Sequence, residues 1–486
     1  MSSKSFQNAS KLNGIVSVLQ FGVVGNGVTD DTIAIQAAID SLGDAGGTIV
    51  IPNGMRCVLD STLIVRSNVG IQGPNIYVGN PTTNAGPSQY NEIGGAFLLS
   101  GTQTITMQGG SSLSGLLIYR KGMTFPQTTV SGWTGTAITA AGDDVSVENC
   151  MILGFDKAFY SNSFQRARLT SLYMDNTNGI EIASCYDIAR VSDCHSWPFT
   201  TVAAHGSGAP AIRSGNAYTF ISGGDWNNIR NCFSYGYNRG LLIEDCSDIT
   251  AIGCGFDNVP SGHPSAIGIV VRGTSDHTKL IGCQTAANGE AGVYVDVNPG
   301  SNLVVNIENL TVWGLSTHGI LVDSGDAVAN GCTFKDVANV LTVTNNLSKV
   351  VLDNSYMKNI SALMVNATVA TTNILIGKNN VCTNFGGDPT SNLSLPAIAS
   401  ASVVLLSNTG SQFYITGTTN IGNLLHAWAG RVVTLIFPSA LTVLDSQPGA
   451  GPIRLNNNAN FTTQAGSTLT LVGVGGEAWN EIGRCF

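Results

Sequence analysis

The 486-residue sequence has few charged residues and no long apolar run. Only 11% of its residues are charged, and the net charge of −9 is not gathered in an acidic block. There is no basic stripe of the kind that binds nucleic acid, so we expect no nucleic-acid partner. The start, "MSSKSFQNASKLNG", lacks the apolar segment of a signal peptide, and no run approaches the roughly 18 apolar residues of a membrane span. We expect a soluble chain with neither a signal sequence nor membrane insertion.

Cysteine is present in the wrong pattern for a disulfide scaffold or a zinc site. The eleven cysteines are scattered along the chain, are odd in number and show no CxxC spacing. This pattern predicts buried free thiols. No metal and no cofactor is expected.

Several cysteines end a recurring phrase. The phrases are "VENC" at Cys150, "VSDC" at Cys194, "IRNC" at Cys232, "AIGC" at Cys254 and "LIGC" at Cys283. The rows that contain them recur at intervals of about 19 to 28 residues, with apolar and polar residues alternating between Gly, Asn and Asp turns. Such short rows can bury an apolar face only by stacking, so they predict a β-solenoid. The alternative, a β-sandwich, is not expected to repeat one phrase at one period.

The stretch "VSVLQFGVVGNGVTDDTIAIQAAIDSLGDAGGTIVIP", residues 16–52, predicts a helical cap for the exposed end of this solenoid. Either Asp30 or Asp31 suits the start of a helix near residues 31–42. The apolar face of that helix would consist of Ile35, Ala38, Ile39 and Leu42. We expect an N-terminal cap region at 1–60 and a solenoid with inserted loops at 61–385.

The same opening resembles the N-terminal signature of the pectate-lyase-like, right-handed parallel β-helix proteins, particularly phage tailspikes and capsule depolymerases. The matching residues run from Phe21 through the glycines, "TDD" and "AIQAAID" to "GGTIVIPNG", with Asn26 in place of the usual Asp. The resemblance implies an all-β fold, a right-handed parallel β-helix. We assign Asp30 and Asp31 to the cap and its turn rather than to catalysis.

The C-terminal part differs in composition from the coils. After the Pro/Ser/Asn-rich stretch 386–400, residues 400–486 alternate as strands expected to pair antiparallel. The phrases "GRVVTLIF", "STLTLV" and "WNEIGR" resemble the C-terminal β-sandwich of many phage tailspikes. This resemblance implies a homotrimer on a virion, with phage tail or baseplate proteins and a bacterial surface polysaccharide as partners.

The coil register predicts a glycan-binding strip. The third position after each cysteine position would stack on one outward face, with neighbouring coils roughly 4.8 Å apart. The residues are Tyr119, Leu153, Asp175, Trp197, Tyr235, Asp257, Ala286 and Trp313. Four of them, from Asp175 to Asp257, would place two aromatic platforms between carboxylates. An ordinary solvated strip with surface aromatics is the alternative interpretation.

Two insertions, residues 195–216 and 257–266, should wall a cleft beside this strip. Its floor would hold Tyr235, Tyr237 and Arg239. The candidate catalytic carboxylates are Asp175, Glu181, Asp225, Glu244 and Asp257. The candidate substrate-binding residues are His195, Trp197, His205, Trp226, Tyr235, Tyr237 and Arg239.

A second column of side chains competes with these candidates. It comprises Asp143, Gln165, Asp187, Asp225, Asp248 and Asp276. Such regularity favours an Asx turn in each coil. Asp225 is retained as a catalytic candidate because "SGGDWNN" disturbs its turn.

These patterns favour a phage receptor-binding tailspike that binds and depolymerises a bacterial capsule, O-antigen or exopolysaccharide. Glycoside hydrolysis needs an acid and a second carboxylate, roughly 5 to 9.5 Å apart, which neighbouring coils can supply. Arg213 and Arg239 keep polysaccharide lyase chemistry open as an alternative. A non-catalytic glycan-binding spike on the same fold is the other alternative.

Overall fold

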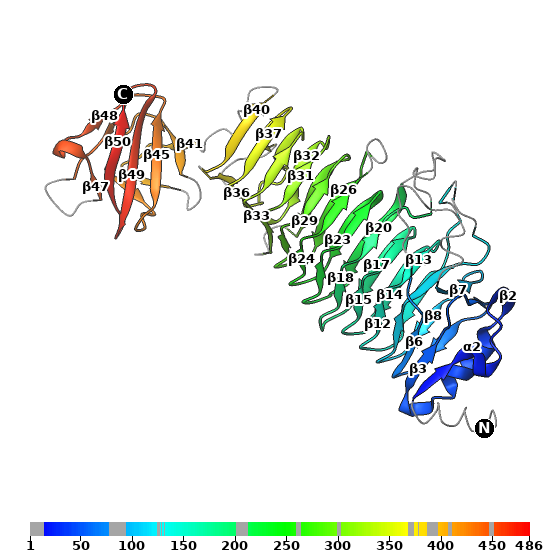
Figure 1. Cartoon of the computed structure of the whole chain (residues 1–486). Helices are drawn as coiled ribbons and strands as arrows, with labels where there is room; N and C mark the ends of the chain where they lie inside the picture. Colours follow the sequence, from blue (N-terminus) through cyan, green and yellow to red (C-terminus); the bar gives the residue numbers. More distant parts are fainter. Residues whose placement is uncertain are drawn as a thin grey trace.

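The computed structural model describes residues 14–76, 94–123, 127, 129–130, 132–200, 212–258, 264–298, 303–367, 374–377, 379–385, 397–406, 411–446 and 452–486. Nearly every element is a β-strand, and residues up to 385 wind into a stack of parallel coils (Figure 1). None of the helices in these ranges is long and apolar enough to cross a membrane.

Three parallel sheets, here called A, B and C, form the sides of the solenoid. Within the described residues, sheets A and B have 14 strands each and sheet C has 12. Sheet A consists of β1 (Ile15–Ser17), β3 (Gly47–Val50), β6 (Val69–Gln72), β9 (Ser112–Ser114), β12 (Ser146–Glu148), β15 (Arg168–Thr170), β18 (Arg190–Ser192), β21 (Asn228–Arg230), β24 (Thr250–Ile252), β27 (Lys279–Ile281), β30 (Val304–Glu308), β33 (Asp326–Asn330), β36 (Val350–Asp353) and β39 (Ile374–Ile376).

Sheet B consists of β2 (Asn26–Asp30), β4 (Arg56–Leu59), β7 (Gly95–Leu99), β10 (Leu116–Arg120), β13 (Met151–Leu153), β16 (Tyr173–Asp175), β19 (His195–Ser196), β22 (Phe233–Tyr235), β25 (Gly255–Asp257), β28 (Gln284–Ala286), β31 (Thr311–Trp313), β34 (Thr333–Lys335), β37 (Tyr356–Ile360) and β40 (Val381–Phe385). Sheet C consists of β5 (Leu63–Val65), β8 (Ile105–Met107), β11 (Thr136–Ala140), β14 (Lys157–Asn162), β17 (Asn178–Ala183), β20 (Arg213–Ile221), β23 (Tyr237–Glu244), β26 (Ile267–Gly273), β29 (Ala291–Val297), β32 (His318–Ser324), β35 (Asn339–Val343) and β38 (Val365–Ala367). The solenoid fold predicted from the repeated rows is confirmed.

The cysteine phrase marks the tight corner between sheets A and B. The residue before each phrase cysteine adopts a positive φ, at Asn149, Asp193, Asn231, Gly253 and Gly282. Asn, Asp and Gly tolerate this conformation better than other residues. The corner turns the following cysteine inward, and all five phrase cysteines are buried and unbridged, as predicted.

A ladder of glycines opens successive strands on the inner side of sheet C. A Cβ on Gly240 would lie 2.7 Å from the carbonyl oxygen of Gly268 and 2.4 Å from the Phe256 side chain. Gly268 and Gly292 meet the next coil in the same way. Backbone and core leave no room for a side chain at these three positions, which explains the Gly at the start of these rows.

The predicted cap is present as α2 (Thr32–Asp40), whose Ile35, Ala38 and Ile39 are buried against the first coils. Asp30 and Asp31 have different roles at the start of this helix. The Asp30 carboxylate accepts from the Thr32 backbone N–H (2.9 Å), whereas buried Asp31 accepts from the N–H groups of Val24 and Gly25 (2.7 and 3.0 Å). The first strands of sheets A and B, β1 and β2, precede this helix in the chain. Three short 3-10 helices complete the helical elements described: η1 (Val18–Phe21), η2 (Gly43–Ala45) and η5 (Asn456–Asn458).

The C-terminal residues form a separate, mixed sheet with its own core. Its strands, in spatial order, are β41 (Ala397–Ala399), β43 (Gln412–Thr416), β45 (Val432–Phe437), β49 (Ser467–Gly475), β50 (Ala478–Cys485) and β47 (Ile453–Arg454). Two small pairs accompany it, β42 (Val403–Leu405) with β44 (Asn423–Leu425) and β46 (Thr442–Val443) with β48 (Phe461–Thr462). The β45–β49–β50 ribbon is antiparallel as expected, but β41, β43 and β45 pair in parallel. Alternation predicts the strands, but the direction of pairing depends on their connections.

Candidate functional site

The predicted column of third positions is present on the outer side of sheet B. Tyr119 pairs with Leu153, Leu153 with Asp175, and Tyr235 with Asp257 in successive coils. Its members nevertheless differ in burial. Tyr119, Leu153 and Asp175 are buried, while Trp197, Tyr235 and Asp257 are partly exposed. The exposed strip is therefore shorter than the column.

Aromatic rings gather over β16, β19 and β22 of this strip. Trp197 stacks on Tyr235, with ring centroids 4.8 Å apart and planes 25° from parallel. His195 contacts the rings of Trp197, Phe199 and Phe233 at 5.3 to 5.6 Å. Its burial lowers the pKa of His195 to about 4, so the imidazole is neutral above that pH. The stacked pair offers an apolar platform of the kind that accepts a sugar ring.

Asp257 lies directly beside this platform, one coil after Tyr235. Burial raises the pKa of its carboxyl above the ordinary value, although the Ala286 backbone N–H donates to Oδ1 (2.9 Å). Burial and the neighbouring Asp257 charge also raise the pKa of Tyr235. A carboxyl that keeps its proton to a higher pH suits a general acid.

Asp175 is not part of this exposed strip. Its side chain and that of Arg213 are both 0% exposed, and they form an ion pair with an N–O distance of 2.6 Å. The Thr200 backbone N–H donates to the other carboxylate oxygen at 2.7 Å. Both oxygens are occupied, because Thr200 and Arg213 of the first insertion fold over Asp175. It lies three coil steps from Asp257, or about 14 Å, which is too far for a hydrolytic pair.

Glu181 and Glu244 lie on a different face, the outer side of sheet C. Glu181 pairs with Lys157 at 2.8 Å, and Glu244 pairs with Arg272 at 2.8 Å. They are two coils apart and offset by two residues along the strand, which puts their Cα atoms about 12 Å apart. The structure does not bring these two carboxylates together with Asp175 and Asp257.

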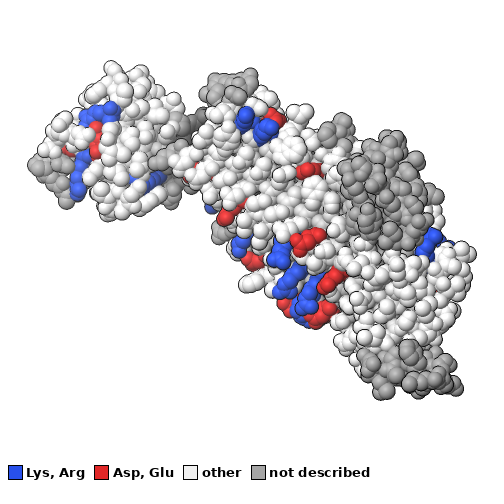
Figure 2. Space-filling view, in the orientation of Figure 1, with Lys and Arg blue, Asp and Glu red and all other residues white. Residues whose placement is uncertain are grey.

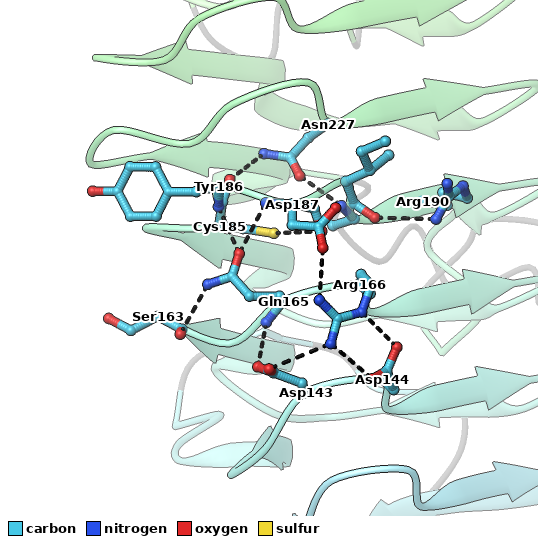
Figure 3. Close-up of polar contacts among 12 residues, drawn as sticks. Asp143, Asp144, Ser163, Gln165, Arg166, Cys185, Tyr186, Asp187, Arg190 and Asn227 are labelled. Carbon is cyan, nitrogen blue, oxygen red and sulfur yellow. Dashed lines mark hydrogen bonds and ion pairs between the residues drawn. The ribbon is translucent and has the colours of Figure 1, made fainter.

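Asp225 and Trp226 lie in the turn that leads from sheet C to sheet A. Burial and the neighbouring Asp248 raise the pKa of Asp225, and its Oδ1 has no hydrogen-bond partner among the described residues. Trp226 is 60% exposed. The column to which Asp225 belongs makes turn-to-turn contacts, such as Gln165 N–H to Asp143 Oδ1 at 2.8 Å (Figure 3). These contacts agree with the structural role expected for the column.

The remaining predicted binding residues are dispersed. Tyr237 is buried in the core, so it cannot form part of an open floor. Arg239 is the third residue of β23 in sheet C, two residues after Tyr237. Burial first, and then the nearby Arg272 charge, lower the pKa of Arg239. His205 and much of both insertions lie outside the described residues.

Sequence reasoning missed a charged cluster on the outer side of sheet C. Besides Arg239 and Glu244 it contains Arg272, Tyr294, Asp296 and Asp323. The Tyr294 hydroxyl donates to Asp323 at 3.1 Å. Its pKa is raised by burial, and further by Asp296 and Asp323.

A signal for this cluster was present in the rows. Its charged members stand four residues after Gly240, Gly268, Gly292 and Gly319, in "GLLIE", "GIVVR", "GVYVD" and "GILVD". A column counted from the glycines rather than from the cysteines would have found it.

Curated proteins match this chain over a short segment. Alginate lyase 7 of Azotobacter vinelandii is 48% identical over 64 residues, which is 12% of this chain and 8% of the relative. The tail spike protein of Shigella phage Sf6 is 41% identical over 63 residues, 12% of this chain and 10% of the relative. The chain thus spans only about a tenth of the length of these relatives. The second match agrees with the tailspike resemblance of the sequence.

Solved structures match over most of the solenoid. The A-module of mannuronan C-5 epimerase AlgE6 of Azotobacter vinelandii aligns with a TM-score of 0.56 and 16% identity, covering 76% of this chain and 99% of that chain. The catalytic unit of a GH87 alpha-1,3-glucanase from Streptomyces thermodiastaticus aligns with a TM-score of 0.52 and 14% identity, covering 77% and 70%. At these identities the likeness concerns the fold.

The family model described as rhamnogalacturonase A/epimerase, pectate lyase-like, matches residues 15–262. This range is 248 of 486 residues and contains the cap, the coils as far as β25 and the aromatic platform. The parallel solenoid and the matched segments agree with it. The chain therefore belongs to the rhamnogalacturonase A/epimerase, pectate lyase-like family of β-helix proteins.

Proposed function

We propose that this protein binds a bacterial surface polysaccharide and depolymerises it. The observation that carries the proposal is the stacked Trp197–Tyr235 pair next to Asp257, a carboxyl with a raised pKa. The printed names of its relatives, which include an alginate lyase, a mannuronan epimerase and a tail spike, support a glycan as the ligand. An aromatic platform holds the sugar and a neighbouring acid acts on the bond.

The proposed reaction is glycoside hydrolysis. Asp257 donates its proton to the leaving glycosidic oxygen, and a second carboxylate assists attack by water or attacks directly. Asp175 is too distant and is paired with Arg213, and Glu181 and Glu244 are each held in an ion pair. We therefore assign the second role to none of these three residues. The hydrolytic mechanism requires the second carboxylate to lie within about 9.5 Å of Asp257.

Elimination by a polysaccharide lyase is the second candidate, and the sheet C cluster favours it. A lyase acting on a uronate needs a cation beside the sugar carboxylate and a base for the adjacent proton. Arg239 has a pKa lowered by burial and has no ion pair within the part of the chain that is described. Tyr294 lies close by. Arg239 would fill the first of these roles.

The biological setting is part of the proposal. The match to the Sf6 tail spike supports a receptor-binding spike on a phage tail, attached to tail or baseplate proteins and acting at the bacterial surface. The expected assembly is a homotrimer. The domain division at 1–60, 61–385 and 400–486 is also proposed, on the grounds of the repeated coil rows and the change in composition after residue 385.

The test is product release from a panel of purified capsules, O-antigens and exopolysaccharides. Hydrolysis predicts new reducing ends without ultraviolet absorbance from an unsaturated sugar, whereas elimination predicts both. Binding to one glycan of the panel without any product would replace depolymerisation by the non-catalytic spike. Neither binding nor products from any glycan would contradict the proposal.

A further inference from the structure

A groove crosses the outer side of sheet A. None of the candidate site residues that the structure describes lies on this face. This groove, hereafter called the sheet A groove, has a volume of about 560 Å³. It is lined by Arg168, Thr170, Arg190, Val191, Ser192, Asn228, Arg230 and Ile252. Three of these are arginines, and the lining contains no carboxylate. Three guanidinium groups are thus gathered on one face of a chain whose net charge is −9.

The arginines are spaced by the coil repeat. Arg168 pairs in register with Arg190, and Arg230 lies on the next strand, opposite Ser192. Neighbouring strands are roughly 4.8 Å apart, so the three cations follow the solenoid axis at regular steps. Each arginine is exposed, and none forms an ion pair within the described part of the chain. A polymer with repeated anionic groups could contact them in sequence.

Arg166 holds three of the neighbouring carboxylates, whereas exposed Glu148 borders the groove on the adjacent strand β12, opposite Thr170. Arg166 pairs with Asp144 at 2.8 Å and with Asp187 at 2.6 Å, and it also contacts Asp143 at 3.4 Å (Figure 3). The Arg166 hydrogen bond, and to a smaller degree the charge of Arg168, lower the pKa of Asp144. Figure 2 shows Lys or Arg and Asp or Glu side chains lying next to one another over the middle coils, while much of the remaining surface in this view carries neither. Arg166 thus pairs with Asp143, Asp144 and Asp187, and these three acids form no ion pair with Arg168, Arg190 or Arg230.

We propose that the sheet A groove binds the repeated anionic groups, carboxylate or sulfate, of an acidic polysaccharide. Guanidinium groups form charge-assisted hydrogen bonds with such oxyanions, and Thr170, Ser192 and Asn228 add neutral polar groups to the groove. The inference rests on the proposed function in taking the anion to be part of a glycan. The groove retains the polymer on a face other than the aromatic platform.

Affinity electrophoresis of the full chain tests this proposal, with polygalacturonate and dextran sulfate as anionic probes and dextran as the neutral probe. The variant R168Q/R190Q removes two cations paired across adjacent strands of sheet A. The matched control K335Q/K358Q removes two cations paired across adjacent strands of sheet B. Both variants change the net charge equally, and thermal unfolding verifies that both are folded.

We expect at least one anionic probe to bind and dextran not to retard the protein. R168Q/R190Q should weaken that binding about tenfold or more, while K335Q/K358Q should change it by less than about twofold. Binding of polygalacturonate alone assigns carboxylate as the anion, and binding of dextran sulfate alone assigns sulfate. Equal losses in the two variants, or no binding of either probe by the wild type, would overturn the proposal.

Product release by the same variants separates this inference from the proposed function. If the protein cleaves a glycan but binds neither anionic probe, the groove proposal is wrong and the depolymerisation proposal stands. If the protein binds a probe through Arg168 and Arg190 but releases no product from any glycan, the groove proposal stands and the depolymerisation proposal is wrong.

Discussion

Asp175 and Asp257 occupy the same register position on sheet B and yet have opposite environments. Asp175 is enclosed with Arg213 and Thr200, whereas Asp257 has no cationic partner within the described residues and keeps a raised pKa. The difference arises from the chain that covers each coil, not from the strand itself. We therefore propose a structural role for Asp175 and a chemical role for Asp257.

Replacing Asp257 by Asn should lower glycan turnover by about 100-fold or more, the scale of losing a general acid. The amide keeps the side-chain volume, so glycan affinity should change little. Initial rates and binding constants for the wild type and Asp257→Asn check this. Unchanged turnover in Asp257→Asn would remove this residue from the reaction.

The same substitution should stabilise the protein at neutral pH. Burial raises the pKa of Asp257 above 3.8, so its contribution to stability is complete below pH 3.8 and falls as the pH rises through the raised value. Asn cannot ionise and avoids that loss. Denaturant unfolding across this range should show a gain for Asp257→Asn that grows with pH.

His195 should make the protein sensitive to acid. Its pKa falls from 6.5 to about 4 in the folded chain, so the unfolded state takes up the proton first as the pH drops. Stability should be lost between pH 6.5 and about 4, and His195→Phe should reduce that loss while keeping the contacts between rings. Thermal unfolding of both proteins over this range is the measurement. Parallel curves for the two proteins would show that His195 does not titrate as described.

At this scale the sequence predicts which side chains share a column but not which of them are open. Cysteine spacing places Asp175, Trp197, Tyr235 and Asp257 in register. It carries no information on Arg213, which lies within the first insertion and covers Asp175. Whether a column of side chains is buried depends on the loops that cover it, and the path of these loops does not follow the coil repeat.

At the scale of elements, the ends of the first insertion are tied to one coil. Thr200 precedes residues 201–211 and Arg213 follows them, and both bind the Asp175 carboxylate. A buried pair of this kind fixes a loop more than it adds stability, because both charges had to leave water. The pair is thus expected to hold the base of the insertion beside the aromatic platform.

Asp175→Asn should destabilise the protein by about 3 to 5 kcal/mol, since it removes the carboxylate that pairs with the buried Arg213 charge. The double variant Asp175→Asn/Arg213→Met should recover much of that loss because no buried charge remains. Denaturant unfolding of the wild type, single and double variants measures both effects. A single variant as stable as the wild type would contradict the enclosure of this pair.

Elements were predictable where local chemistry repeats. The residue before each phrase cysteine identifies the corner between sheets A and B, and the helical spacing of Ile35, Ala38 and Ile39 identifies α2. The parallel pairing of β41, β43 and β45 was not predictable, because each strand alternates in the same way whatever its partner's direction.

At the scale of the molecule, the solenoid presents three faces with different chemistry. Sheet B carries the aromatic platform and Asp257, and sheet C carries the cluster around Arg239 and Tyr294. The third face carries the sheet A groove. Each face repeats at the coil spacing of roughly 4.8 Å. Such a surface suits an extended polymer better than a small molecule.

Assembly is the prediction that belongs to the whole chain. Exposed apolar side chains in the C-terminal part, among them Val403, Leu405, Val432 and Phe486, motivate a homotrimer in which they become shared core. Light scattering should report three chains per particle, and deletion of 400–486 should lower stability or yield. A stable monomer at micromolar concentration would contradict this assembly.

The most direct test of the account is glycan affinity after removal of one platform ring. Trp313 is a matched control, because it is a tryptophan in the same column of sheet B and is 41% exposed outside the platform. With the glycan that the wild type binds, Trp197→Ala should weaken affinity about tenfold or more, while Trp313→Ala should leave it unchanged and both variants remain folded. Equal affinity of folded Trp197→Ala and wild type would show that the glycan binds elsewhere.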